Sequence, residues 1–318
     1  MTDLRARVGS VVLPNPVMTA AGTSGHGAEL GDFFDLSILG AVVVKSLSAG
    51  PWSGNPAPRV CAVPGGMLNG VGLQGPGIDA WAKEDLPALS RSGARVVVSI
   101  WGRRIEEYAE AAERLARALD RCPDGVVAVE VNVSCPNLED RSRMFAHSPS
   151  ATAAAIAASK VCGRPLWAKL SPNTSDLLDV AGAALEAGAE ALTLVNTLLG
   201  LAIDERRRRV TLGAGGGGLS GPALHSVALR AVFDCAAAYP GAPIVGVGGI
   251  ADGAGAVRML LAGACAVQVG TATLADPRAP QRVLAELCRI LDSDGTESVG
   301  DLVGAAHEPP PALPGGTP

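Results

Sequence analysis

The sequence predicts an α/β fold, specifically a closed (β/α)8 barrel with inserted loops at the carboxyl ends of its strands. Eight short apolar runs recur along the 318 residues, and each is followed by an amphipathic stretch rich in Ala and Leu, as in successive βαβ units. Hydrophobic residues make up 48% of the chain but aromatic residues only 3%, so the core must be aliphatic, as in buried parallel strands. No Gly-x-Gly-x-x-Gly turn follows the first run, which disfavours an open dinucleotide-binding sheet.

The apolar runs give the expected strand positions. They lie at residues 17–20, 41–45, 96–100, 126–132, 166–170, 191–196, 244–247 and 266–270. Helices are expected between them, at 106–119, 176–187 and 222–237. Eight such units match a TIM barrel that forms one catalytic domain, residues 1–293.

Two connections, 46–89 and 197–219, are longer than ordinary loops of this fold. Because both follow strands, we expect them at the carboxyl-terminal mouth of the barrel, where long loops are usually functional. Beyond residue 293 the sequence becomes polar and then Pro-rich. Such a composition buries too little apolar surface to order itself, so residues 294–318 are expected to be a disordered tail.

Charge and composition exclude several classes of protein. The formal net charge of −5 argues against general attraction to nucleic acid or to an anionic membrane, and the basic run at 206–209 is interpreted as a solvated loop. Neither a signal peptide nor an apolar run long enough to span a bilayer is found. The seven cysteines lack CxxC or Cys/His spacing, so no metal site is expected, and a reducing cytoplasm fits them.

Polar residues stand at the ends of several predicted strands. Lys45, Asn132, Lys169 and the pair Asn196–Thr197 all occupy such positions. Each alone is more easily explained as a capping or solvated residue. For Lys169, an ordinary ion-paired lysine is the alternative. Because the carboxyl ends of barrel strands meet at one mouth, their convergence favours a site.

Glycines follow the last two strands, in the runs 246–250 and 270–271. Many barrels bind a phosphate group there, because glycine lets backbone N–H groups approach it closely. The run 215–222 opens the next helix after strand six and offers further amide donors, although alone it would be only a flexible loop.

The most specific local motif is Asn-Val-Ser-Cys-Pro-Asn at 132–137. A thiol flanked by asparagines and a proline after a strand is an uncommon packing solution, so Cys135 is a candidate catalytic group. A buried structural thiol is the alternative.

At this motif the sequence resembles the dihydroorotate dehydrogenases, specifically the cytosolic class 1 enzymes that use a cysteine base. The match runs from about residue 15 to 273. Its stretches are 15–20, 66–74, 132–137, 169–173, 196–198, 217–222 and 248–250. The wording of 66–69 and 217–222 is most similar to the NAD-linked class 1B catalytic subunit.

The resemblance implies oxidation of dihydroorotate to orotate in pyrimidine (UMP) biosynthesis, with hydride transfer to FMN and Cys135 as the base that removes the C5 proton. It implies that substrate is held by Lys45, Asn69, Gly70, Val71, Gly72, Leu73, Asn132, Asn137, Asn196 and Thr197. It implies that FMN is held by Ala21, Lys45, Ser46, Ser99, Asn132, Lys169, Val195, Gly221, Gly248, Gly249, Gly270 and Thr271. A separate FAD and iron–sulfur subunit and a homodimer core are implied as partners, with NAD or fumarate as the final acceptor.

Three positions depart from the family pattern. Ala21 stands where a serine commonly contacts the flavin, Ser99 where asparagine is usual, and Gly75 where a second asparagine is usual. Each change removes polar reach, at about 1 kcal/mol per lost hydrogen bond, which a site with many contacts survives. Two alternatives stay open: a flavoenzyme of this fold acting on another pyrimidine, similar to dihydropyrimidine dehydrogenase, and a non-catalytic barrel that binds a phosphorylated ligand.

Overall fold

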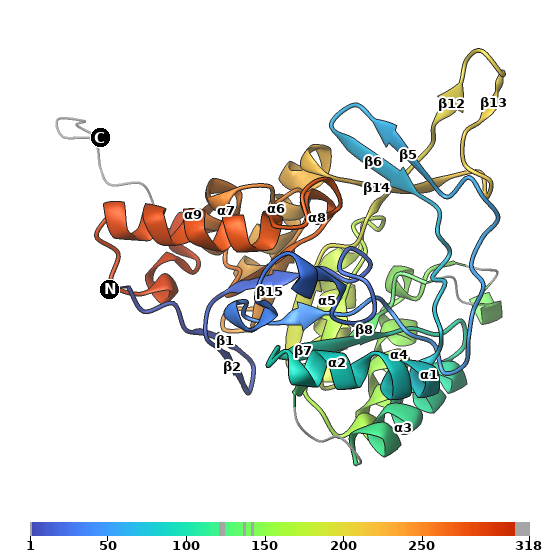
Figure 1. Ribbon diagram of the computed structural model, residues 1–318, viewed down its shortest axis with the longest axis horizontal. Helices are drawn as coiled ribbons and strands as arrows, with labels where there is room; N and C mark the ends of the chain where they lie inside the picture. Colours follow the sequence, from blue (N-terminus) through green and yellow to red (C-terminus); the bar gives the residue numbers. More distant parts are fainter. Residues whose placement is uncertain (1, 121–124, 136–137, 141–142, 309–318) are drawn as a thin grey trace.

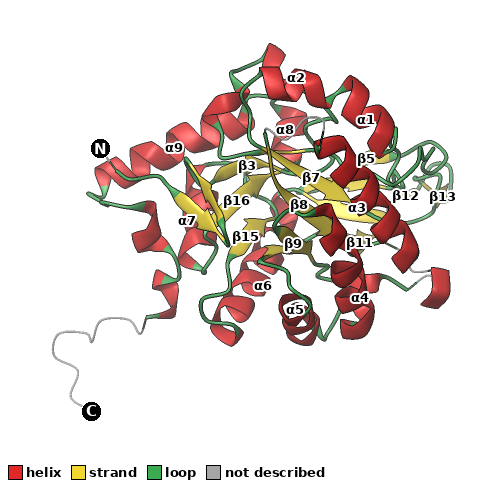
Figure 2. Ribbon diagram, turned by 90° about the horizontal axis from the view of Figure 1, so that it is seen from below, coloured by secondary structure: helices red, strands yellow, loops and turns green. Residues whose placement is uncertain are grey.

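The computed structural model describes residues 2–120, 125–135, 138–140 and 143–308. Its centre is an eight-stranded parallel sheet that closes on itself (Figure 2). The strands, in sheet order, are β3 (Val17–Thr19), β16 (Ala266–Val269), β15 (Ile244–Val247), β10 (Ala191–Leu194), β9 (Leu166–Lys169), β8 (Val126–Asn132), β7 (Val96–Ile100) and β4 (Val42–Val43). A parallel bridge between Met18 and Ala41 joins β3 to β4, so the barrel is complete. The predicted fold class and all eight predicted strand positions are confirmed.

Helices surround the barrel (Figure 2). They are α1 (Ile78–Glu84), α2 (Leu86–Arg91), α3 (Ile105–Leu119), α4 (Pro149–Ser159), α5 (Leu177–Glu186), α6 (His225–Ala238), α7 (Gly253–Leu261), α8 (Thr271–Ala275) and α9 (Ala279–Ser293). The spacing of Tyr108, Ala111, Ala112, Leu115 and Leu119 places these buried side chains on one face of α3, which packs on the barrel. Of the predicted helices, 106–119 and 176–187 match α3 and α5. The third, 222–237, divides into a 3-10 turn at Pro222–Leu224 and α6.

A short antiparallel hairpin of β1 (Ala6–Val8) and β2 (Val11–Leu13) packs its apolar side chains against one end of the barrel core. Its residues Val8 and Leu13 are fully buried beside Met18, Val97 and other inward-facing strand residues. The hairpin therefore covers the amino-terminal end of the barrel, and the opposite end is left for a site.

The two long connections form one structure at that opposite end. Segment 46–89 contributes β5 (Val60–Val63) and β6 (Gly66–Asn69), and segment 197–219 contributes β11 (Leu198–Gly200) and β14 (Gly217–Ser220). They pair in the antiparallel order β11-β14-β6-β5, and the small hairpin of β12 (Ile203–Asp204) and β13 (Arg209–Val210) projects beyond them (Figure 1). The arginines at 206–209 lie on this exposed hairpin, as predicted.

The alternative in which 215–222 is only a flexible loop is wrong in its central part. Gly217–Ser220 is strand β14, whose neighbours leave no room for a side chain at Gly217 or Gly218. A Cβ on Gly217 would lie 2.6 Å from the Asn69 carbonyl oxygen, and one on Gly218 would lie 2.0 Å from Thr197 Oγ1. The glycines are needed for close strand packing rather than for flexibility.

The expected disorder from residue 294 is also wrong for residues 295–308. This segment forms 3-10 turns at Val299–Leu302 and Ala305–His307, and Val299 is 1% exposed in the core. The His307 ring stacks on Phe233 with a centroid distance of 3.9 Å. Composition misled the prediction because a few apolar contacts anchor an otherwise polar segment. Residues 309–318 lie outside the described part of the chain.

Candidate active site

Side chains at the ends of neighbouring strands form a hydrogen-bonded network in the barrel mouth. Ser46 Oγ and Ser99 Oγ are 2.8 Å apart, and Asn132 Nδ2 donates to Ser46 Oγ at 3.3 Å. Asn196 Nδ2 donates to Asn132 Oδ1 at 3.2 Å. The structure therefore brings together residues of β7 and β8 and of the segments after β4 and β10. Ser99, the shorter side chain at a position where asparagine is usual in the family, takes part in this network through its contact with Ser46.

Lys169 is buried within the barrel and is ion-paired. Its Nζ lies 3.3 Å from Glu130 Oε1, and Gln268 Nε2 donates to Glu130 Oε2 at 2.8 Å. Glu130 is fully buried, so the lysine is required to neutralise it. Sequence reasoning missed Glu130 and Gln268, because neither lies at the end of its strand. Lys169 is therefore ion-paired, as the alternative interpretation stated. The role of Lys169 beside the flavin stays a prediction.

Lys45 is the contrasting lysine, because it is half-buried and makes no ion pair with any described residue. Burial lowers its pKa, and the positive charge of Arg59 lowers it further. A partly desolvated cation without a counter-ion is suited to bind an anionic ligand group. Arg59, which precedes β5, was not predicted and adds positive potential to this part of the mouth.

Cys135 is completely buried. Its thiol donates a 3.4 Å hydrogen bond to the backbone oxygen of Asn132, and the Tyr108 hydroxyl donates to the same oxygen at 2.8 Å. Burial raises the pKa of the thiol, a hydrogen bond with Tyr108 lowers it, and the charge of Glu107 raises it. Tyr108 was missed, since nothing in its sequence position on α3 indicates contact with the cysteine. The predicted substrate residue Asn137 lies outside the described residues.

The predicted substrate loop 70–73 follows β6. Gly70 N–H donates to the Arg59 carbonyl at 2.7 Å, and the Gly72 carbonyl accepts from Trp52 Nε1 at 3.0 Å. Leu73 has a φ of 61°, an unfavourable conformation for a branched side chain that tends to persist at functional sites. Asn69 Nδ2 donates to the Gly218 carbonyl at 3.3 Å, so this asparagine also joins the two insertions.

Gly75, a position where asparagine is usual in the family, is explained by its neighbour. A Cβ at this position would lie 3.3 Å from His26 Nε2, a buried nitrogen with no hydrogen-bond partner among the described residues. Burial lowers the pKa of His26, and the charge of Lys45 lowers it further. The imidazole therefore fills space that a larger residue 75 would need, and it supplies a neutral polar atom there.

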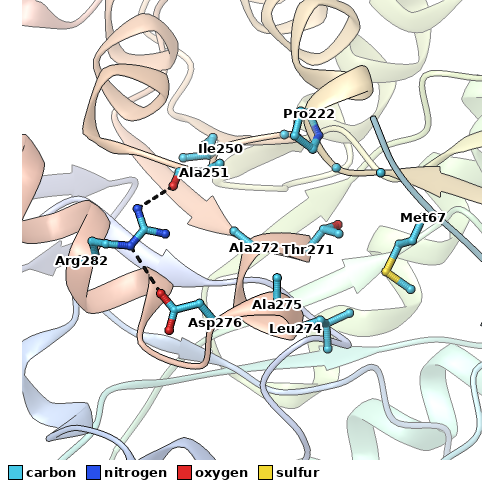
Figure 3. A pocket seen from close by; sticks show the side chains of 13 residues that line it. Met67, Pro222, Ile250, Ala251, Thr271, Ala272, Leu274, Ala275, Asp276 and Arg282 are labelled. Atoms are coloured by element: carbon cyan, nitrogen blue, oxygen red, sulfur yellow. Dashed lines mark hydrogen bonds and ion pairs between the residues drawn. The ribbon is translucent and has the colours of Figure 1, made fainter. Parts of the chain in front are cut away.

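A cavity of about 510 Å³ lies at the carboxyl ends of β15 and β16 (Figure 3). Its lining includes Gly221, Gly249 and Thr271, three of the predicted phosphate-binding residues. A Cβ on Gly249 would lie 2.8 Å from the Gly221 carbonyl oxygen, and one on Gly221 would lie 2.7 Å from Gly66 Cα. Both glycines also have positive φ, of 67° and 104°. Only glycine fits this cradle without strain.

The cradle also offers unpaired donors. Within the described residues, the N–H groups of Gly249 and Thr271 have no hydrogen-bond acceptor, and Thr271 begins helix α8, whose first N–H groups lack intrahelical partners. Backbone N–H groups lining a glycine-walled cavity suit a phosphate group. The residues present therefore fit the phosphate end of a mononucleotide cofactor.

His225, at the start of α6, orients this cradle and was not predicted. Arg258 Nε donates to His225 Nε2 at 3.3 Å, so the imidazole must carry its hydrogen on Nδ1, which lies 2.9 Å from the Gly248 carbonyl oxygen. Because the peptide is planar and trans, the Gly249 N–H points away from the ring. Gly249 lines the cavity, so His225 fixes the direction of one cradle donor.

For the remaining predicted cofactor residues, the structure shows burial and backbone contacts. Val195 is buried and its N–H donates to the Val247 carbonyl at 2.8 Å. A Cβ on Gly270 would lie 3.4 Å from Ala20 Cβ. Ala21, which follows Ala20 in the chain, is half-buried. No group of three metal-ligating side chains is found in the described part of the chain.

At one end of the closed barrel lie a glycine-walled cavity lined by N–H groups, a buried thiol and a lysine without an ion-pair partner among the described residues. These features fit a class of protein: a barrel enzyme that uses a phosphorylated cofactor. The family model for dihydroorotate dehydrogenase matches residues 3–291. The chain belongs to the dihydroorotate dehydrogenase family.

Relatives of nearly equal length narrow the identification. The chain is 45% identical over 304 residues to the protein of Citrifermentans bemidjiense named dihydroorotate dehydrogenase B (NAD(+)), catalytic subunit, covering 95% of this chain and 98% of that one. It is 46% identical over 301 residues to the protein of the same name from Desulforudis audaxviator, covering 94% and 96%. The ligand-free dihydroorotate dehydrogenase structure from Eimeria tenella superposes with a TM-score of 0.78 at 23% identity, covering 96% and 92%, which supports the fold.

Proposed function

We propose that this protein is the catalytic subunit of an NAD-linked dihydroorotate dehydrogenase, which oxidises (S)-dihydroorotate to orotate in the biosynthesis of UMP. The observation that carries the proposal is the grouping, at the strand ends of a barrel, of an amide network, a thiol and a lysine that has no ion-pair partner in the described part of the chain. A glycine-walled cavity suited to a phosphate group follows the last two strands. Similarity to the class B catalytic subunits over almost the whole chain supports the same reaction.

In this proposal the chain's own residues bind and orient the substrate. Lys45 neutralises the substrate carboxylate, and the amides of Asn132 and Asn196 pair with the cyclic imide, to which an amide can both donate and accept. Cys135 Sγ removes the C5 proton: the C5–H bond breaks, an S–H bond forms, and the electron pair enters the new C5–C6 double bond as hydride leaves C6. Bound FMN supplies the hydride acceptor, and the cradle at Gly221, Gly249 and Thr271 would hold its phosphate.

The electron path and location complete the proposal. A separate subunit carrying FAD and an iron–sulfur cluster would pass electrons to NAD, in keeping with the name "catalytic subunit" of the relatives. A homodimer core and a cytoplasmic location are proposed with it. The cysteines in the described part of the chain are all unpaired, and no helix there is long and apolar enough to cross a membrane.

The test is anaerobic reduction of the bound flavin by dihydroorotate. Wild type should bleach, and Cys135→Ala should bleach roughly 10²–10⁴-fold more slowly, the usual contribution of a general base. Cys235→Ala removes another fully buried thiol, on α6, and serves as the matched control that should retain the rate. Bound flavin that stays oxidised in wild type would exclude dihydroorotate and direct attention to other dihydropyrimidines.

A further inference from the structure

A buried tyrosine lies beside the proposed base. Tyr108, on α3, is fully buried, and its ring packs edge-to-face on Phe145 at a centroid distance of 5.3 Å. The phenol is thereby held in place, with its hydroxyl directed toward the loop that follows β8. Its hydroxyl and the Cys135 thiol both donate to one acceptor, the Asn132 backbone oxygen, at 2.8 and 3.4 Å.

Two donors on one carbonyl have a chemical consequence when the thiol loses its proton. The sulfur then has nothing to donate and becomes an acceptor with a full negative charge, in a fully buried position. The Tyr108 hydroxyl is a neighbour of that sulfur, because both groups contact the same Asn132 oxygen. Because burial raises the pKa of Tyr108 well above its ordinary value, the phenol keeps its hydrogen and stays a donor.

We propose that Tyr108 is a positioning residue for Cys135: its hydroxyl donates to the Asn132 carbonyl while the thiol is protonated and turns to donate to the sulfur when the thiolate forms. The inference rests on the proposed role of Cys135 as base. The proton of the thiol leaves to solvent before the reaction, and the C5 proton of the substrate later restores the thiol. Tyr108 keeps its own hydrogen throughout and changes only the atom to which it donates.

The acceptor oxygen belongs to Asn132, whose side chain is part of the mouth network through Ser46 and Asn196. The same residue thus connects the resting position of the base with the groups proposed to hold the substrate. The other ionisable group that acts on Cys135 among the described residues is Glu107, which opposes the thiolate. Glu107 is paired with Arg103 at 3.0 Å, which limits that opposition.

Alkylation of Cys135 by iodoacetamide, followed on its own peptide by mass spectrometry, tests the inference without any substrate. The rate depends on the thiolate fraction and on the access of the reagent to the buried thiol, and a change that leaves the packing intact alters only the thiolate fraction. Tyr108→Phe keeps the ring and removes only the hydroxyl, so Cys135 should react about 10- to 100-fold more slowly at a given pH, an upward pKa shift of about one to two units. Cys61 in the same sample is the internal reference, and Tyr239→Phe is the matched control.

Flavin bleaching by dihydroorotate gives the second reading. In Tyr108→Phe the pH dependence of the bleaching rate should move to higher pH by the same amount, while the KM for dihydroorotate stays unchanged. An unchanged or faster alkylation of Cys135 in a variant that unfolds at the wild-type temperature would overturn the inference. Wild type that alkylates as expected but does not bleach would instead overturn dihydroorotate as substrate, so the two failures are distinguishable.

Discussion

At the scale of single residues, the half-buried ammonium group of Lys45 determines how the proposed substrate should bind as pH changes. Burial and the charge of Arg59 lower its pKa, so Lys45 should lose its proton below the ordinary lysine value of about 10.4. The KM for dihydroorotate should therefore begin to rise at a pH below that ordinary value. Lys45→Gln should raise the KM about 10- to 100-fold at neutral pH and abolish this alkaline rise, as measured by steady-state kinetics.

Lys83→Gln, an exposed lysine on α1, is the control and should leave both the KM and its pH dependence unchanged. Stability should respond in the opposite direction. Because the pKa of Lys45 is lower in the folded than in the unfolded state, the free energy of unfolding should rise with pH between the two values. A KM that stays flat up to the ordinary lysine value would contradict the assignment of Lys45.

Residues at strand ends could be predicted from the sequence, but their partners could not. Lys45, Asn132 and Asn196 follow from their positions after apolar runs and from the family resemblance. Glu130 and Tyr108 do not, because they act through contacts between residues far apart in the chain, such as Gln268 with Glu130 and α3 with the loop after β8. The burial of Cys135 could not be predicted either, since a sequence motif does not show how exposed its side chains are.

At the scale of elements, His225 at the start of α6 should affect cofactor binding although it is not expected to contact the cofactor. His225→Ala removes the hydrogen bond to the Gly248 carbonyl and frees the cradle peptide to rotate. We expect FMN to bind the apo-protein about five-fold more weakly, the factor for roughly 1 kcal/mol, measured by flavin fluorescence titration. His307→Ala, which removes a ring stacked on Phe233, is the control; equal losses in both variants would argue against a specific role for His225.

The eight barrel strands were predictable because buried parallel strands have continuous apolar sequences. The strands of the insertions were not, because their sequences are short, glycine-rich or polar. The stretch Gly217–Ser220 looks like a linker until β6 is placed beside it. Pairing between segments about 150 residues apart leaves no periodicity in either segment.

At the scale of the whole molecule, the segment 295–308 fastens the chain ends to the barrel. Val299 N–H donates to the Asp3 carbonyl at 2.8 Å, and Gly304 N–H donates to the Leu260 carbonyl at 3.0 Å. A chain ending at residue 308 should match the full protein. A chain ending at residue 294 should lose about 3 kcal/mol, a fall in Tm of about 5 °C for a chain of this length, from one buried apolar side chain and these hydrogen bonds.

Differential scanning calorimetry of the three proteins, saturated with FMN, decides this. Equal melting temperatures for all three proteins would mean that residues 295–308 do not stabilise the fold. The segment would then behave thermodynamically as the tail that its composition predicts. A loss already seen on removal of 309–318 would assign the stabilisation to that terminal stretch instead.

The antiparallel pairing of β6 with β14 has a consequence for how members of this family can diverge. Asn69, before the substrate loop, donates to Gly218, and a Cβ on Gly218 would meet Thr197, so each insertion is shaped to the other. A change in either must be accommodated across the shared ladder. A chimera that takes only one insertion from a relative would therefore pair β6 and β14 strands that do not match. A chimera that takes both insertions together would keep their pairing intact, so the two segments should be exchanged between relatives as one unit.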